Sequence, residues 1–118
     1  MPPIKVTEND KVEIRITIGG NTRIEYYLLC KKANAKEIKT VFDSNGKKPL
    51  TVRTVDICGC LVKGRNLVWA QFVNVLPDKG DVKCSGSIEL LVNGESRLKD
   101  SYSKNHPSYI SNDFIIVL

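Results

Sequence analysis

The sequence has little of what enzymes commonly use for catalysis. It has a single histidine, His106, and no Gly-x-Ser-x-Gly element that would hold a serine nucleophile on a rigid turn. No glycine-rich loop that would cradle a phosphate follows a predicted strand. The acidic residues that would have to pair as general acid and base are scattered along the chain. We therefore predict a protein that is not an enzyme and needs no cofactor, with a hydrolase using His106 as the alternative.

Long apolar segments are also absent. No run is long enough to span a membrane, and the N-terminal residues Met1–Lys5 lack the apolar core of a signal peptide. We expect no membrane insertion. The compartment stays open between the cytosol and an extracellular location that is reached without a classical signal peptide. A chain of 118 residues, 42% of them hydrophobic and 26% charged, is typical of one globular domain, 1–118.

Close cysteine pairs are scarce. The four cysteines are Cys30, Cys58, Cys60 and Cys84, which would permit two disulfides in any of three connectivities. A four-cysteine zinc site usually needs two Cys-x2-4-Cys pairs, and this chain has one close pair with only Gly59 between its members. We interpret the cysteines as buried free thiols that behave as small apolar residues, and we predict no metal.

The pattern that is present indicates strands. The run Leu67–Leu76 contains the only tryptophan, Trp69, and is bounded by turn formers, so we predict a central strand that is buried on both faces or nearly so. The apolar residues at 12, 14, 16 and 18 alternate with polar ones, as in a strand with one buried face. Gly19–Thr22 predicts a hairpin turn that leads to a partner strand over Arg23–Cys30.

Further elements follow along the chain. Asn34–Glu37 has the form of a helix cap and precedes Ile38, Val41 and Phe42 at helical spacing, which predicts one short helix. Asn93-Gly94 is a strong hairpin signal. The remaining strands are expected over Leu50–Leu61, Val82–Val92, Glu95–Tyr102 at an edge, and Tyr109–Leu118. Gly59 marks a bulge or a close backbone approach in the first of them. Together they predict an all-β fold, an immunoglobulin-like antiparallel β-sandwich of seven to eight strands with one short helix.

Two groups of residues are candidates for binding. Tyr102 and Tyr109 flank the loop that holds His106, and together with Asn93 they form a predicted sugar-binding group, because aromatic rings pack on sugar faces while amides bond the hydroxyls. The alternative is that each tyrosine plugs an end of the sandwich. The second group is a basic segment with a net charge of +4 over residues 31–48, namely Lys31, Lys32, Lys36, Lys39, Lys47 and Lys48 against Glu37 and Asp43.

The basic segment would attract nucleic acid, anionic lipid or acidic glycans, or it forms an ordinary solvated surface. No arginine or aromatic residue lies among its lysines in the way that nucleic-acid sites usually require, so we expect nucleic acid to be an unlikely partner.

Four short segments carry a family resemblance. Gly64-Arg65-Asn66-Leu67 and Asn112-Asp113-Phe114-Ile115-Ile116 are distinctive, while Ile38-Lys39-Thr40-Val41 and Asp78-x-Gly80 are weaker. With modest gaps, the chain resembles the fungal immunomodulatory proteins, a family of small lectin-like proteins.

The resemblance implies an immunoglobulin-like sandwich, metal-free binding of cell-surface glycans or glycoproteins, stimulation of immune cells, and a homodimer formed through the N-terminal segment. The matching positions for dimerisation are Val12, Ile14, Ile16 and Ile18. The chain departs from the family in its four cysteines and in having a strand pattern, with Ile18 about where the family's dimerising helix holds a tryptophan. We thus predict a non-enzymatic, lectin-like homodimer. The alternative is a cytosolic module that binds nucleic acid or another polyanion through the basic segment.

Overall fold

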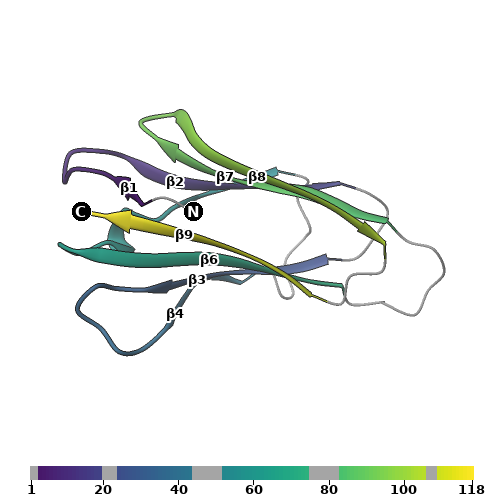
Figure 1. Cartoon of the computed structure of the whole chain (residues 1–118), viewed down its shortest axis with the longest axis horizontal. Helices are drawn as coiled ribbons and strands as arrows, with labels where there is room; N and C mark the ends of the chain where they lie inside the picture. The colour runs from purple at the N-terminus through teal and green to yellow at the C-terminus, as the bar shows by residue number, and fades with distance from the viewer. Residues whose placement is uncertain (1–2, 20–23, 44–51, 75–82, 106–108) are drawn as a thin grey trace.

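The computed structural model describes residues 3–19, 24–43, 52–74, 83–105 and 109–118, which form two packed β-sheets (Figure 1). The five-stranded sheet has the order β1 (Ile4–Lys5), β9 (Tyr109–Val117), β6 (Arg65–Asn74), β3 (Ile24–Lys31) and β4 (Lys39–Asp43). The four-stranded sheet has the order β5 (Val52–Asp56), β2 (Val12–Gly19), β7 (Lys83–Val92) and β8 (Glu95–Asn105). The prediction of an all-β sandwich is confirmed, and its immunoglobulin-like detail stays a prediction.

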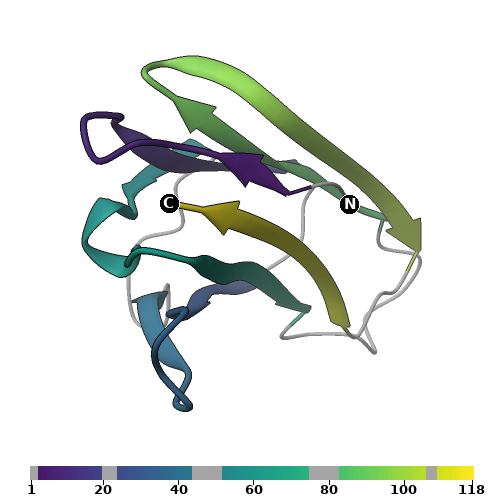
Figure 2. The same cartoon turned by 60° about the vertical axis from the view of Figure 1, so that its left-hand side comes forward.

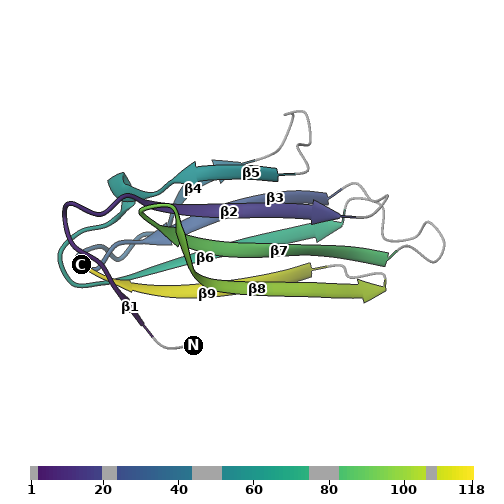
Figure 3. The same ribbon diagram turned by 90° about the horizontal axis from the view of Figure 1, so that it is seen from above.

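Neighbouring strands run antiparallel except at one edge. There β1 pairs in parallel with β9, and β4 forms the opposite edge of the same sheet (Figure 2). Seen from above, β5, β2, β7 and β8 lie side by side over the other sheet (Figure 3). The strand β6 lies between β9 and β3, so the predicted central strand is at the centre of its sheet. Over residues 66–71, whose burial is described, the strand is buried on the inner face and half-buried on the outer face.

The core follows from the period of two in the strands. Alternate residues of a strand point to opposite faces, so each sheet turns one apolar row toward the other. Within the described residues, the hydrophobic residues that are no more than 1% exposed come from both sheets and from the segment after β5: Val12, Ile14, Ile16, Tyr26, Leu28, Cys30, Ile57, Val68, Ala70, Ile88, Leu90, Phe114 and Ile116.

The Asn93-Gly94 hairpin is confirmed. Asn93 has φ 53° and Gly94 has φ 82°, the two positive angles that a tight turn between β7 and β8 needs. The strand that follows, β8, is at the edge of its sheet, as its polar sequence predicts.

The predicted short helix is wrong. The segment from Lys39 onward forms the edge strand β4, which pairs with β3, and Ile38 is 57% exposed instead of packing on a helical stripe. Two helical turns would form few hydrogen bonds for the residues that they order. As a strand, the same residues bond along β3, and Phe42 stacks on Tyr26 with ring centroids 5.7 Å apart.

The hairpin predicted at Gly19–Thr22, which would pair β2 with β3, is also wrong. β2 pairs with β5 and β7, whereas β3 pairs with β4 and β6, so the chain crosses from one sheet to the other between them. The turn itself, residues 20–23, lies outside the described residues. A glycine-rich turn favours a reversal of the chain, but it does not state whether the next strand joins the same sheet.

The strand predicted over Leu50–Leu61 ends earlier than expected. β5 stops at Asp56, and Cys58–Cys60 form η1, a single turn of 3-10 helix. Gly59 thus marks neither of the predicted alternatives, a bulge or a close backbone approach, since a Cβ there would meet no atom within 4 Å. The Asp56 carboxylate accepts a hydrogen bond from the Cys58 backbone N–H at 2.9 Å, which favours the turn over a continued strand.

Arg53 of β5 ties the two sheets together at the side where β4 and β5 lie. Its Nε donates a hydrogen bond to the Tyr26 hydroxyl at 3.0 Å, and its guanidinium carbon lies 4.5 Å from the centre of the Phe42 ring. The cation thus contacts the π face of one aromatic residue and bonds the other.

Asn66 fixes the start of β6. Its side chain is fully buried, and its amide group donates hydrogen bonds to the carbonyls of Val62 (2.9 Å), Ile116 (3.2 Å) and Gly64 (3.3 Å). Its side-chain oxygen accepts from the backbone N–H groups of Ala33 (3.0 Å) and Val62 (3.2 Å). One side chain therefore joins the turn before β6 to β9 and to the segment after β3.

Gly64 is required in this turn. Its φ is +117°, and a Cβ at this position would lie 3.0 Å from the Cβ of Ala33. Its backbone also exchanges two hydrogen bonds with Leu118, at 2.9 and 3.0 Å. The end of the chain and the start of β6 are thereby held side by side.

We predict that Asn66→Ala lowers the free energy of unfolding by about 3 kcal/mol, because buried backbone groups lose their partners. Urea denaturation followed by circular dichroism measures this change. Ser96→Ala, at an exposed position of β8, is the control and is expected to change stability by less than about 0.5 kcal/mol. A loss below about 1 kcal/mol for Asn66→Ala would contradict the role given to this amide.

Candidate functional site

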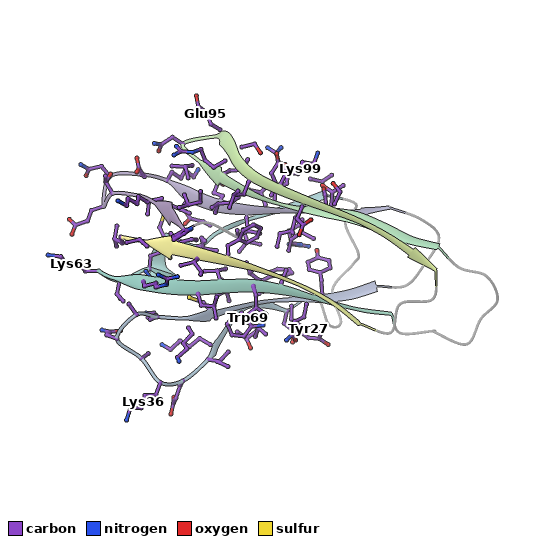
Figure 4. The ribbon with its side chains drawn as sticks, in the orientation of Figure 1. Tyr27, Lys36, Lys63, Trp69, Glu95 and Lys99 are labelled. Atoms are coloured by element: carbon purple, nitrogen blue, oxygen red, sulfur yellow. The ribbon has the colours of Figure 1, made fainter. Side chains whose placement is uncertain are left out.

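The outer side of the five-stranded sheet carries an aromatic pair. Tyr27 of β3 lies opposite Gln71 of β6, and Leu29 lies opposite Trp69, so the two aromatic residues are diagonal neighbours. Diagonal neighbours on adjacent strands are about 7–8 Å apart, within reach of large side chains. Both are half-buried and project from the sheet on the side away from β2 and β7 (Figure 4).

The same side of the sheet becomes basic toward the start of β6. In the next row, Lys31 lies opposite Leu67, which in turn lies opposite Ile115 of β9. One row further, Arg65 lies opposite Val117, which pairs with Lys5. We call this surface the outer face; it comprises Tyr27, Leu29, Lys31, Arg65, Leu67, Trp69, Gln71, Ile115 and Val117.

Two open cavities adjoin the basic end of the outer face. The larger has a volume of about 330 Å³ and is lined by Lys31, Lys32, Ala33, Ala35, Arg65, Asn66, Leu67 and Ile115. The smaller has a volume of about 310 Å³ and is lined by Lys32, Ala35, Lys36, Glu37 and Lys39. The linings share Lys32 and Ala35 and hold five cationic side chains against one carboxylate. We call these two the basic cavities.

The basic cavities rest on a tight turn after β3. The N–H of Ala35 bonds the carbonyl of Lys32 at 3.1 Å, and the N–H of Ala33 bonds Asn66 at 3.0 Å. This turn projects its lysines on the same side of the molecule as Trp69, as Lys36 shows in Figure 4. Its position is thus fixed by the same asparagine that fixes β6.

The structure gathers part of the predicted basic segment and adds a residue to it. Lys31, Lys32, Lys36 and Lys39 line the basic cavities, while Lys47 and Lys48 lie outside the described residues. Arg65 joins them from β6, although it is distant in sequence. The signal that could have found it is the Gly64-Arg65-Asn66 turn, in which the arginine follows a glycine that brings the backbone close to Ala33.

The predicted sugar-binding group is not brought together. Asn93 lies at the β7–β8 hairpin, whereas Asn105 ends β8, which at its 11 residues spans about 36 Å. The Asn93 amide donates to Asp10 at 2.8 Å and accepts from the Lys11 N–H at 2.9 Å, so it fastens the loop before β2. The prediction that Asn93 acts with the other three is therefore corrected to a structural role.

The other three members of that group are not described in detail. Tyr102 occupies a position of β8 opposite Gly86, and Tyr109 begins β9 opposite Val73. Their side chains, and the whole of His106, lie outside the described residues.

Three of the four residues assigned to dimerisation lie in the core instead of on a surface. Val12, Ile14 and Ile16 are at most 1% exposed, because the apolar row of β2 packs against the other sheet within one chain. The side chain of Ile18 lies outside the described residues. These three core residues cannot also contact a second copy, so that prediction is corrected for them.

Cys30, Cys58 and Cys60 are free thiols. The buried Cys30 donates to the carbonyl of Cys60 at 3.3 Å, and burial raises its pKa to about 11. Burial also raises the pKa of Cys60 and that of Cys58. Cys58 is an exposed residue, so the prediction that the cysteines are buried is wrong for it. The thiols stay protonated at neutral pH and are poor nucleophiles. The side chain of Cys84 lies outside the described residues, and the described residues contain no cluster of three metal-ligating side chains.

Comparisons with known proteins give no relative: no family model, no curated protein and no solved structure matches the chain. The suspected family membership therefore stays a prediction. The two distinctive segments of the resemblance are neighbours, since Asn66 of β6 lies opposite Ile116 of β9. Within the described residues, no helix has both the length and the apolar character needed to cross a bilayer.

The Asp10 contacts predict an acid-dependent contribution to stability. Hydrogen bonds from the Thr7 backbone and from Asn93 hold the pKa of Asp10 below its usual value of 3.8. The folded state thus favours the charged carboxylate, so its stabilisation is complete above that value and is lost as pH falls through the lowered pKa.

We expect Asp10→Asn to be less stable than the natural chain at neutral pH and to lose less stability on acidification. Thermal unfolding followed between pH ~6 and ~2.5 measures both effects. Asn93→Ala removes one of the two contacts and should show the same trend more weakly. Parallel curves for Asp10→Asn and the natural chain would sink this assignment.

Proposed function

We propose that the protein is a non-enzymatic, lectin-like protein that binds a glycan on the outer face. The observation that carries the proposal is the aromatic pair Tyr27 and Trp69, presented beside the Gln71 amide on adjacent strands. Aromatic rings pack against the apolar faces of sugar rings, while an amide donates to and accepts from their hydroxyls.

The strand that carries Trp69 lies inside its sheet, which suits a binding surface. Trp69 projects from the central strand β6, which is bonded on both sides, so its backbone is fixed before a ligand arrives. A ring that is already ordered loses little conformational freedom on binding. From Tyr27 to Lys31 the face extends about 13 Å along β3, which suits a short oligosaccharide rather than a single sugar.

The family resemblance supports the same class of ligand, because it implies glycan binding without a metal. The proposal moves the site from the loop of His106 to the outer face. The homodimer that the resemblance implies would give each particle two such faces and would raise its avidity for a cell surface. Light scattering on the purified protein tests that part separately.

A glycan array probed with the natural chain tests the proposal, and variants locate the site. We expect Trp69→Ala and Tyr27→Ala each to weaken binding by about tenfold or more, and Trp69→Phe to weaken it less because a ring remains. Val52→Ala, at a 51% exposed position on the other sheet, is the control and should bind normally. Urea denaturation verifies that every variant is folded.

A silent array would overturn the proposal. So would a set of bound glycans whose affinity is unchanged in both Trp69→Ala and Tyr27→Ala. Binding that disappears instead in a Tyr102→Ala variant would return the site to the residues first predicted from the sequence.

A second candidate is binding of nucleic acid or another polyanion, and the five cationic residues of the basic cavities favour it. Affinity for RNA or DNA of unrelated sequence should then fall steeply as salt rises. It should fall in Lys36→Gln and Lys39→Gln and be unaffected by Trp69→Ala. No binding at low salt would remove this candidate.

A further inference from the structure

We infer that the basic cavities hold the anionic group of an acidic oligosaccharide, a sulfate or a carboxylate, whose sugar rings lie on the outer face. This inference rests on the proposed function and specifies its ligand class. It joins two features that the sequence keeps apart, the aromatic pair and the basic segment.

The larger basic cavity and the outer face are continuous. Leu67 and Ile115 belong to the face and also line the cavity. Trp69 is two residues from Leu67 on the same side of β6, about 7 Å along the strand. A sugar ring packed on Trp69 therefore places the substituents of the next ring at the mouth of the cavity.

The charges around that mouth suit an oxyanion. Lys31 of β3 lies opposite Leu67, and Arg65 lies two residues before Leu67 on β6. The half-buried Lys32 lines both cavities. A guanidinium group bonds two oxygens of a sulfate or carboxylate at once, and the lysines add point charges. The carboxylate of Glu37 lines the smaller cavity, and Arg65 lines the larger one.

Charge is unevenly distributed along the outer face. Lys5, Arg65 and Lys31 lie toward the start of β6, whereas Asp43 lies opposite Tyr27 at the other end. An acidic saccharide is therefore expected to bind with its charged residue toward Arg65 and with neutral rings toward Tyr27. A uniform polyanion would gain nothing from this polarity.

The closing experiment uses isothermal titration calorimetry to compare two forms of one neutral hexasaccharide, a sulfated form with a single sulfate on its terminal sugar and a desulfated form without it. We expect the sulfated form to bind about tenfold or more tightly, and its affinity to fall with rising salt. Arg65→Gln should remove most of that difference, because it should weaken binding of the sulfated form far more than binding of the desulfated form. Trp69→Ala should weaken the binding of both forms.

Two further variants serve as controls. Lys99→Gln removes an equal charge from β8 on the opposite sheet (Figure 4) and should bind both saccharides as the natural chain does. Arg65→Lys keeps the charge but not the planar fork, and its affinity for the sulfated form should fall between those of the natural chain and Arg65→Gln. Both Arg65 variants must unfold at the same urea concentration as the natural chain, so that a loss of affinity is not a loss of folding.

The results that would overturn the inference differ from those that would overturn the proposed function. Equal affinity for both saccharides, with no effect of Arg65→Gln, overturns the inference and leaves the proposed function standing. No binding of either saccharide, or of any neutral glycan, overturns both. Binding of the sulfated form that competes with an RNA oligomer and is unaffected by Trp69→Ala also overturns the inference and favours the polyanion function.

Discussion

The buried amide of Asn66 is the interaction on which the rest of this structure depends. A sandwich must position three backbone segments where the central strand begins, and a buried carbonyl or N–H there needs a partner. One side chain supplies five such contacts, to the turn before β6, to β9 and to the segment after β3. An apolar residue of the same size would pack equally well but would leave those groups unpaired.

The outer face and the basic cavities follow from that constraint. Because Asn66 points inward, Arg65 and Leu67 on either side of it must point outward. Because its oxygen holds the Ala33 N–H, the lysine-bearing turn stays against β6. The two most distinctive segments of the family resemblance meet at this junction, where Asn66 lies opposite Ile116 and bonds its carbonyl.

The sequence predicts strands well where local and global demands agree. The alternation in β2 and the apolar run in β6 reflect which side chains are buried, and the structure confirms both strands. The sequence-based prediction fails where long-range pairing determines the structure. The segment from Ile38 to Phe42 fits a helical stripe, yet pairing with β3 and contact with Tyr26 and Arg53 make it a strand. The turn after β2 marks a reversal, but the choice of sheet depends on which strands arrive later.

The candidate site was beyond sequence reasoning for the same reason. Residues near one another in a loop, such as Tyr102 and Tyr109, invite grouping, but a sheet makes neighbours of residues on adjacent strands. Tyr27 and Trp69 become diagonal neighbours only through the β3–β6 register, which also places Lys31 opposite Leu67, and Lys31 and Arg65 line the same cavity. That register turns two separate hypotheses, an aromatic sugar site and a basic polyanion site, into two ends of one surface. Its rigid centre is apolar and its charge lies at one end, so discrimination among glycans would come from the position of the anion, and the aromatic pair would supply affinity common to all of them.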